Sequence, residues 1–408
     1  MKKLLILSGD SYHVPFIKKA VSMGYYTITC DYFENNPGHK FAHEYHNVSY
    51  MDKEAVLALA MDLKIDGITC FAADEAMTTV TYVAEKLGLP TYPYKSIEII
   101  NNKDRFREFL SKHNFHVPKA KGYTSFEEAK SEILQYKMPV MIKPVDSSGS
   151  RGISKIDSIE YLEDKIAYAL SFSKAKRFII EEYIEKHGYQ VGGDCFSVNG
   201  ELVFRCFTNN HLNPTNLNPF VPLGGSWPSV LPEHIQNKVQ NEIQRLINLL
   251  GMKTGPYNFD IQIDRNENIF FIEMGARIGG NLIPHITNYA TGVDLIEYTI
   301  KAALGEDCSD LTMVNPTGYW SCYIINSQNS GIFKGIEIDS DFEKNNVVEY
   351  ELFVKPGDSI SAFTGSDKKL GSMVLKYASL EEMLDTMDNI DCFIKVKLED
   401  SLESSLLN

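Results

Sequence analysis

Cysteine is scarce and scattered in this chain, with seven in 408 residues and no two closer than eleven positions. That spacing provides neither the paired cysteines of a zinc site nor the framework of a disulfide-stabilised domain. Long apolar runs are absent too, and none approaches the ~20 residues needed to span a bilayer. The basic N-terminus is followed by only a short apolar run, Leu4 to Leu7, which predicts a strand and not a signal peptide. We therefore expect a cytoplasmic protein with no membrane partner.

Positive charge is also in short supply. Lys and Arg number 40 against 54 Asp and Glu, a formal net charge of −14. This negative charge argues against a nucleic-acid partner, because binding nucleic acid needs a basic face to neutralise phosphates. The hydrophobic fraction of 44% is ordinary for a globular protein, and the length allows two or three domains.

Strand and helix alternate over the first 95 residues, which predicts an α/β domain with a parallel sheet. Its expected elements are strands near 4–7, 27–30 and 67–71, and helices near 14–23, 53–63 and 74–87. The loop at 8–15 has one glycine where a dinucleotide fold carries its glycine fingerprint, so NAD binding there is disfavoured.

From residue 96 the pattern becomes α+β. We expect one helix over 96–113 with Lys103 near its middle, a helix over 125–136, strands near 139–144 and 177–184, and a hairpin turning at Asn199-Gly200. The proline-rich stretch 209–232 predicts a long binding loop. Helices are expected over 232–250 and 294–304, and the last ~100 residues look like a small, separate, β-rich lobe.

Two acids lie on a predicted hairpin that should bring them together. Asp260 and Glu273 are on apolar runs joined by the polar turn 264–268, and antiparallel pairing of the runs places both carboxylates at one point. Two acids inside such apolar strands repel each other unless a cation lies between them. Mg²⁺ held by carboxylates, with positions left open for phosphate oxygens, is the natural candidate.

Small residues follow a strand-end lysine, Lys143, in a pattern suited to phosphate. The loop after the strand contains Ser147, Ser148, Gly149 and Ser150. Its backbone N–H groups and hydroxyls can surround an anion, and the lysine adds positive charge.

Taken together, these features resemble the ATP-grasp superfamily, carboxylate–amine ligase branch, with an architecture like biotin carboxylase and the carbamoyl-phosphate synthase large chain. The resemblance covers the whole chain and rests on Asn102-Lys-Asp104 with Arg107, the 142–152 loop, Glu181-Glu-Tyr-Ile184, and Gly255 to Asp260 paired with Phe271 to Gly280. It implies a Rossmann-like domain over 1–95, an ATP-grasp domain over 96–310 with an ATP lid at about 137–190, and a C-terminal lobe over 311–408.

The resemblance also implies site residues. ATP would contact Lys103, Lys143, the 147–150 loop, the adenine hinge Glu181, Glu182, Tyr183 and Ile184, and Gln190, with Asp194 the alternative to Gln190 at the ribose. Mg²⁺, or Mn²⁺, would be bound by Asp260 and Glu273. Arg277 would hold the acyl phosphate or substrate carboxylate, and other substrate contacts would come from Gly279, Gly280, Asn281, Glu75 and His211.

The chain departs from many relatives in having Gly275 where they have Asn, so the metal shell would lack that ligand or fill it with water. His211, His234 and His285 are candidate bases for an amine.

The expected activity is ADP-forming ligation of a small carboxylic acid, of the amino-acid kind, to an amine through an acyl phosphate. Two alternatives stay open: a purine-pathway ligase of the phosphoribosylglycinamide synthetase kind or a carboxylase-like enzyme, and a non-catalytic nucleotide-binding protein. Related folds are commonly dimers, so a homodimer is one expectation.

Overall fold

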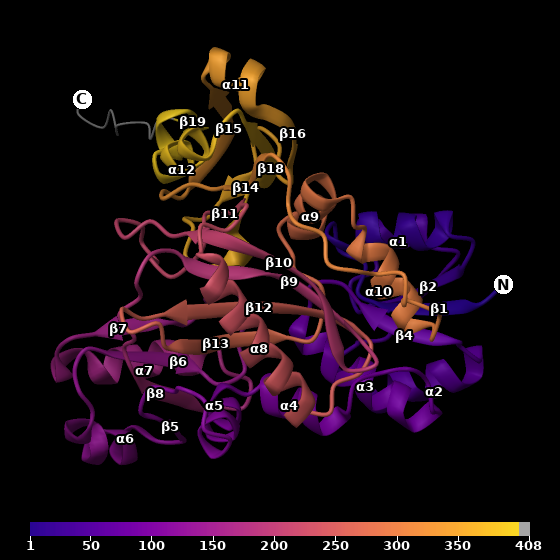
Figure 1. Ribbon diagram of the computed structural model, residues 1–408, viewed down its shortest axis with the longest axis horizontal. Coiled ribbons are helices and arrows are strands. Elements are labelled where there is room, and N and C mark those ends of the chain that lie inside the picture. Colours follow the sequence, from indigo (N-terminus) through magenta and orange to yellow (C-terminus); the bar gives the residue numbers. More distant parts are fainter. Residues whose placement is uncertain (400–408) are drawn as a thin grey trace, which may run out of the picture.

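The computed structural model describes residues 1–399. Its N-terminal unit is the parallel sheet expected from the sequence, in the strand order β3-β2-β1-β4 (Figure 1). Leu4 to Leu7 are fully buried between covering helices, which explains their continuous apolar run. The elements are β1 (Lys3–Leu7), α1 (His13–Ser22), β2 (Tyr26–Cys30), β3 (Glu44–His46), α2 (Lys53–Leu63), β4 (Gly67–Cys70) and α3 (Asp74–Leu87).

This topology positions two loops. β1 and β4 are parallel neighbours, so the loops after their carboxyl ends emerge at the same edge of the sheet. Asp10 lies in the first loop, and Asp74 begins α3 after the second. Both acids line the main cavity described below.

The helix expected over 96–113 is in fact two helices, α4 (Tyr94–Ile100) and α5 (Lys103–Lys112). The break falls at Asn101-Asn102, where Asn102 is extended with φ −121° and ψ 109°. Lys103 is therefore at the start of α5 and not in the middle of a helix, and its backbone N–H donates to Val145 O at 2.9 Å.

A second, antiparallel sheet forms the lobe at lower left in Figure 1 and has the order β5-β8-β6-β7. Apolar residues of its strands pack with Leu162 and Ile166 of the covering helix α7 in a core of their own. The elements are β5 (Ala120–Tyr123), α6 (Phe126–Glu132), β6 (Val140–Pro144), β7 (Ser154–Ile156), α7 (Leu162–Ser171) and β8 (Phe178–Glu182).

The central sheet has eight strands in the order β13-β12-β9-β10-β11-β14-β18-β16. One expectation is wrong here. The stretch 209–232 is not all loop, because 209–211 extend β10 and 224–227 form β11. The C-terminal residues join the central sheet through β14, which pairs with β11, and the C-terminal lobe over 311–408 stays a prediction. The strands are β9 (Gln190–Val198), β10 (Glu201–His211), β11 (Gly224–Trp227), β12 (Gly255–Ile263), β13 (Ile269–Gly275), β14 (Tyr319–Ile325), β16 (Val347–Leu352) and β18 (Gly371–Tyr377).

Helix α8 (Glu233–Leu249) covers this sheet with Ile235, Val239, Ile243 and Leu246, whose spacing of three or four residues makes one apolar face. Helices α9 (Ile283–Thr291) and α10 (Leu295–Ala303) follow β13. The C-terminal part adds β15 (Gly331–Ile338), β17 (Ser359–Ile360) and β19 (Ile394–Leu398), which form a three-stranded sheet, and α11 (Ser340–Asn346) and α12 (Leu380–Asp388).

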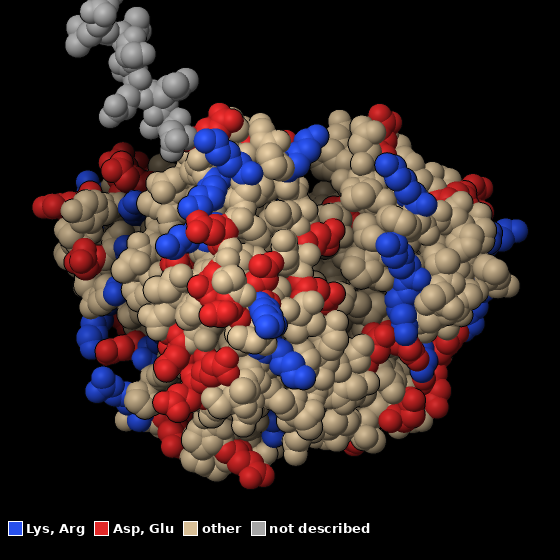
Figure 2. All heavy atoms as spheres, turned by 90° about the horizontal axis from the view of Figure 1, so that it is seen from above, with Lys and Arg blue, Asp and Glu red and all other residues tan. Residues whose placement is uncertain are grey.

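No helix within residues 1–399 is both long and apolar enough to cross a membrane. On the face shown in Figure 2, basic and acidic side chains are interspersed.

Candidate active site

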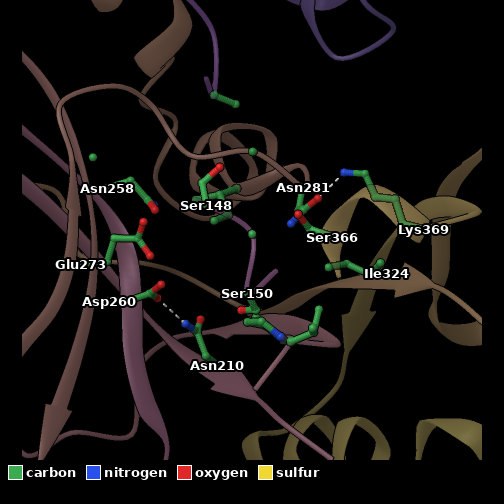
Figure 3. Close-up of a pocket in the computed structure, with 18 of the residues that line it drawn as sticks. Ser148, Ser150, Asn210, Asn258, Asp260, Glu273, Asn281, Ile324, Ser366 and Lys369 are labelled. Atoms are coloured by element: carbon green, nitrogen blue, oxygen red, sulfur yellow. Dashed lines mark hydrogen bonds between the residues drawn. The ribbon is translucent and has the colours of Figure 1, made fainter. Parts of the chain in front are cut away.

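The two acids of the hairpin do meet. β12 and β13 pair antiparallel with Asp260 directly opposite Glu273, so the predicted register is confirmed, and a bulge follows at Asp260/Ile261. Asn210 Nδ2 on β10 donates to Asp260 Oδ1 at 3.0 Å (Figure 3). Burial, and then the Glu273 carboxylate, raises the pKa of Asp260 to about 7. The two carboxylates therefore repel each other when both are ionised, unless a cation offsets their charge.

These residues fit Mg²⁺ bound together with phosphate. Within residues 1–399 no group of three or more His, Cys, Asp or Glu forms a complete metal cage. Mg²⁺ is usually held by one or two carboxylates, with substrate phosphates and water completing the octahedron. Asp260 and Glu273 would supply the two carboxylates, and both line the main cavity.

Arg277 is held by an acid from the N-terminal unit. Its Nη2 donates to Asp74 Oδ2 at 2.7 Å, and both side chains are largely buried. Burial alone would lower the pKa of Arg277, but Asp74 raises it above its ordinary value. Arg277 Nε and Asp74 Oδ1 are buried without a hydrogen-bond partner in the described chain. Such unpaired groups beside a cavity are suited to a polar substrate, because leaving them unpaired is costly.

The same ion pair gives a physical reason for Gly275. A Cβ at this position would lie 2.6 Å from Asp74 Oδ1 and 2.8 Å from Arg277 Cζ. The space that a larger side chain at position 275 would need is therefore occupied by the Asp74–Arg277 pair. Asn258 lies opposite Gly275 on β12 and lines the cavity beside Asp260.

Lys143 takes part in a buried charge network that the sequence did not reveal. Its Nζ donates to Glu181 Oε1, and Arg107 Nε donates to Glu181 Oε2 at 2.9 Å. Burial opposes ionisation of Glu181, but Arg107 and Lys143 lower its pKa to about 2. The Glu181 side chain thus positions the two cations, whereas the sequence assigned this residue to the adenine hinge.

Arg107 also ties α5 to the metal hairpin. Nη1 donates to Phe271 O and Nη2 to Ile272 O, each at 3.0 Å. These are the two residues before Glu273, so Arg107 fixes the strand that carries the metal acid. From the sequence, Arg107 is recognised only as part of a motif. A buried arginine in a polar helix gives no local signal of this role.

The serine- and glycine-rich loop is held from several sides. Lys103 Nζ donates to Ser147 O at 2.6 Å and lies 3.8 Å from Glu273 Oε1. Asn218 Nδ2 donates to Ser150 O at 2.9 Å, and Ser150 Oγ donates to Phe220 O at 2.8 Å. Ser147 Oγ is buried with no partner in the described chain, which fits a hydroxyl prepared for a phosphate oxygen.

A cavity of about 540 Å³ connects the loop to the metal acids. Asp260 and Glu273 form one wall, Ser148 and Ser150 lie across from them, and Lys369 is at the other end (Figure 3). A second cavity, of about 390 Å³, adjoins it and shares Asp74, Ser148 and Glu273 while adding Lys103 and Ser147 to its lining. The volume suits small molecules.

Several predicted contacts lie elsewhere. His211 is buried, with Nδ1 2.8 Å from Asp388 Oδ1 and Nε2 2.8 Å from Ser226 Oγ, and it does not line the main cavity. Glu75 lines the adjoining cavity and is paired with Lys174 and Arg151. Neither residue lines the main cavity, and a substrate contact at either stays a prediction.

The glycines after Arg277 differ in placement. Gly280 and Asn281 line the main cavity, as expected for substrate contacts. Gly279 does not, and its N–H donates to Asp194 Oδ1 at 2.9 Å. The Gly279 N–H is therefore already used, and a substrate contact at this glycine stays a prediction.

Asp194, the alternative ribose contact, does not line the main cavity, and its ribose role stays a prediction. It is fully buried, and its Oδ1 accepts from Asn258 Nδ2 at 2.8 Å as well as from Gly279. Burial raises the pKa of Asp194 to about 7, although its hydrogen bonds and Arg277 favour the carboxylate. Gln190, the other ribose candidate, is buried on β9 opposite Asn210 and stays a prediction.

The predicted adenine hinge lies at the end of β8 and in the loop after it. Glu182 N–H donates to Lys119 O and Tyr183 N–H to Pro139 O, while Ile184 N–H makes no hydrogen bond within residues 1–399, which leaves it free for a ring edge. His234 is exposed on α8. His285 borders a smaller cavity of about 180 Å³.

Comparison with known proteins agrees with this geometry. Residues 136–285 match the family model described as ATP-grasp domain. A formate-dependent phosphoribosylglycinamide formyltransferase of Sulfolobus acidocaldarius is 25% identical over 97% of each chain. An uncharacterized protein, y4rH, of Sinorhizobium fredii is 25% identical over 74% of this chain, which spans only 62% of that protein. An L-amino acid ligase structure from Bacillus licheniformis superposes with a TM-score of 0.81 over 98% of this chain and 99% of the other, at 20% identity.

Proposed function

The chain contains an ATP-grasp domain, and from this premise we propose that it is an ADP-forming ligase joining a small carboxylic acid to an amine. The observation that carries the proposal is one wall of the main cavity. It brings together Asp260 and Glu273, suited to Mg²⁺, and Arg277, suited to a carboxylate or its phosphorylated form.

The charges explain the chemistry. Asp260 and Glu273 would hold Mg²⁺, which when bound would offset the negative charge of the ATP phosphates. Lys103, bonded to Ser147 O, and Lys143, paired with Glu181, would add positive charge for the phosphates, and Arg277 would hold the acid. An oxygen of the substrate carboxylate then forms a bond to the γ-phosphorus while the bond to ADP breaks. The amine attacks the acyl carbon of the resulting acyl phosphate, phosphate leaves, and the nitrogen loses a proton.

Small, uncharged or zwitterionic amines fit the cavity better than a nucleotide-sized substrate. The lining residues that come from positions 1–95 are Asp10, Tyr12, Ala72 and Asp74, so the N-terminal unit itself contributes acids and no Lys or Arg. A phosphoribosyl group needs cations for its phosphate. The purine-ligase alternative is supported by the relative's name and disfavoured by this lining.

The proposal has finer parts. Mn²⁺ can replace Mg²⁺ at an oxygen site of this kind. A cytoplasmic location suits the free thiols of Cys30, Cys70, Cys195, Cys206, Cys308, Cys322 and Cys392. We also propose that the protein forms a homodimer, because related folds are commonly dimers.

An ADP-release screen tests the proposal. The protein would be incubated with ATP, Mg²⁺ and pairs of amino acids, other small acids and amines, with mass spectrometry for the product. We expect ADP and an amide in equal amounts for some pairs, and neither with Glu273→Gln. ADP release with no condensed product, or release that ignores the acid, would contradict the proposal.

A further inference from the structure

Lys369 is a half-buried cation with no acid of its own. It lies just before β18, and its Nζ is 3.6 Å from the centroid of the Tyr12 ring and 5.9 Å from that of Phe353. It donates to Asn281 Oδ1 (Figure 3). Within residues 1–399 no carboxylate lies within ion-pair distance of Nζ, and the acid that acts on it is Asp10.

The other cations that line the same cavity are already paired. Arg277 is bound to Asp74, and Arg151 is 3.6 Å from Glu75. Asp10 is itself engaged, with Oδ1 2.8 Å from His13 Nδ1. Of the described lining cations, Lys369 is therefore the one without an ion-pair partner, so it can receive a second anion from a substrate. Burial lowers its pKa to about 7, and an anion beside it would restore the charge that burial disfavours.

Its position decides which group it meets. Asp260 and Glu273 are on one side of the close-up, Lys369 is on the other, and Ser150, Asn281 and Ser366 lie between them (Figure 3). The reacting carboxylate must be beside the metal acids and Arg277, so it cannot also reach Lys369. A group at Lys369 belongs to a part of a substrate that does not react.

We propose that Lys369 binds a second, unreactive carboxylate, carried by the amine substrate, and so selects amino acids as acceptors. The inference rests on the ligase function proposed above. A carboxylate is favoured over a phosphate because Asp10 and Asp367 line the same end of the cavity and would repel a dianion. Asn281, held by Lys369, would be the neighbouring amide contact. The same chemistry could come from a dicarboxylic acid substrate, and the experiment separates the two sources.

The variants are Lys369→Met, which keeps an apolar stem for the aromatic rings, and Lys369→Arg, which keeps the charge. Lys376→Met is the matched control, because this lysine is exposed on β18 and lies outside the cavity lining. Each protein is tested with L-amino acids against their carboxamides as acceptors, and with dicarboxylic acids against their monoamides as acids. Binding of the same compounds in MgADP is measured by calorimetry, independently of turnover.

For the wild type we expect KM and Kd to be roughly ten- to a hundred-fold lower for the amino acid than for its carboxamide, as for a charge-assisted hydrogen bond. Lys369→Met should remove this preference by weakening the amino acid alone, Lys369→Arg should keep part of it, and MgADP affinity should not change. Lys376→Met should match the wild type.

Three results would overturn the inference. One is a wild type that treats the amino acid and its carboxamide alike, or binds neither. Another is a preference that persists in Lys369→Met. The third is a preference found only between the dicarboxylic acid and its monoamide, which would move the carboxylate to the acid substrate. If no product forms but amino acids still bind in a Lys369-dependent way, the ligase proposal is wrong while the carboxylate site at Lys369 is retained.

Discussion

At the scale of single residues, Asp260 and Glu273 show what the sequence can predict. Alternating apolar residues on each side of a short polar turn fix a hairpin and its register, because a shift by one residue would turn every side chain to the other face. The pairing of Asp260 with Glu273 follows from that local pattern. Asp74, Arg107 and Lys369 have no comparable pattern, since their partners are far along the chain.

Glu273→Gln keeps the side-chain volume and removes one of the two negative charges offered to the metal. We expect Mg²⁺-dependent ADP formation to be lost while the melting temperature stays close to that of the wild type. The measurement is ADP release against Mg²⁺ concentration, with a thermal melt as the folding control. Near-normal turnover at saturating Mg²⁺ would show that Glu273 is not a metal ligand.

Arg277→Lys separates the role of the planar guanidinium from that of its charge. Lysine cannot grip two oxygens at once and cannot keep both the Asp74 contact and a substrate contact. We expect nearly unchanged ATP affinity by calorimetry and a severe loss of ligation rate in steady-state kinetics with each substrate varied. A defect confined to the ATP dependence would make Arg277 a phosphate ligand instead of an acid ligand.

At the scale of elements, the end of β13 and the loop after it are shaped by groups from other parts of the chain. Gly275 leaves room for the Asp74–Arg277 pair, and Asp194 on β9 holds Gly279 through its backbone N–H. The sequence shows the glycines but not the reason for them, because the neighbouring atoms come from α3 and β9. The break between α4 and α5 was missed for a different reason, as the apolar pattern continues across Asn101-Asn102.

Gly275→Ala introduces a Cβ where the closest atoms would be at 2.6 and 2.8 Å, so Asp74 or Arg277 must move. Misplacing a substrate-holding group by about 1 Å can cost up to about a hundred-fold in rate. We expect kcat for ligation to fall more than ATP affinity. In the double variant with Asp74→Ala, we expect kcat to fall by less than the two single losses combined, because the Cβ then has room. Strictly additive losses would mean that Gly275 acts independently of the Asp74–Arg277 pair.

Asp194 should give the stability of the protein a distinctive pH dependence. Its pKa is raised from 3.8 to about 7 in the folded protein, so between these values the folded state binds more protons than the unfolded state. The free energy of unfolding therefore falls as pH rises through this window, by at most about 1.4 kcal/mol per pH unit from this group.

The Asp194→Asn variant should show a weaker fall of stability from pH 5 to pH 7 than the wild type, measured by urea unfolding at each pH. Asparagine keeps an oxygen for the Asn258 and Gly279 hydrogens and does not ionise. Identical slopes in the two proteins would show that Asp194 is ionised throughout this range.

At the scale of the whole molecule, the alternation of strand and helix predicted the N-terminal α/β unit, and the assembled motifs predicted the ATP-grasp domain, which the family match confirms. The continuous central sheet could not be foreseen. Its β11 is a four-residue strand with two glycines in a proline-rich stretch, and it pairs with β14 nearly a hundred residues later. Such long-range pairing leaves no periodic trace in the sequence.

The same sheet brings the C-terminal residues to the active site. Ser366 N–H donates to Gly149 O at 3.2 Å, and Lys369 lines the cavity together with residues of β12 and β13. The site is therefore built from the N-terminal unit, the lobe of β5 to β8, the central sheet and the C-terminal part together. In the proposed function, an acid substrate held among them would be phosphorylated and then attacked in this one cavity.

Oxygen transfer tests this central claim most directly. The acid substrate identified in the screen would be labelled with ¹⁸O in its carboxylate and incubated with the amine, ATP and Mg²⁺, and the released phosphate would be analysed by mass spectrometry. An acyl phosphate requires that one ¹⁸O atom appear in phosphate for each amide formed, with ADP as the other product. Amide formation with unlabelled phosphate, or with AMP in place of ADP, would contradict the account.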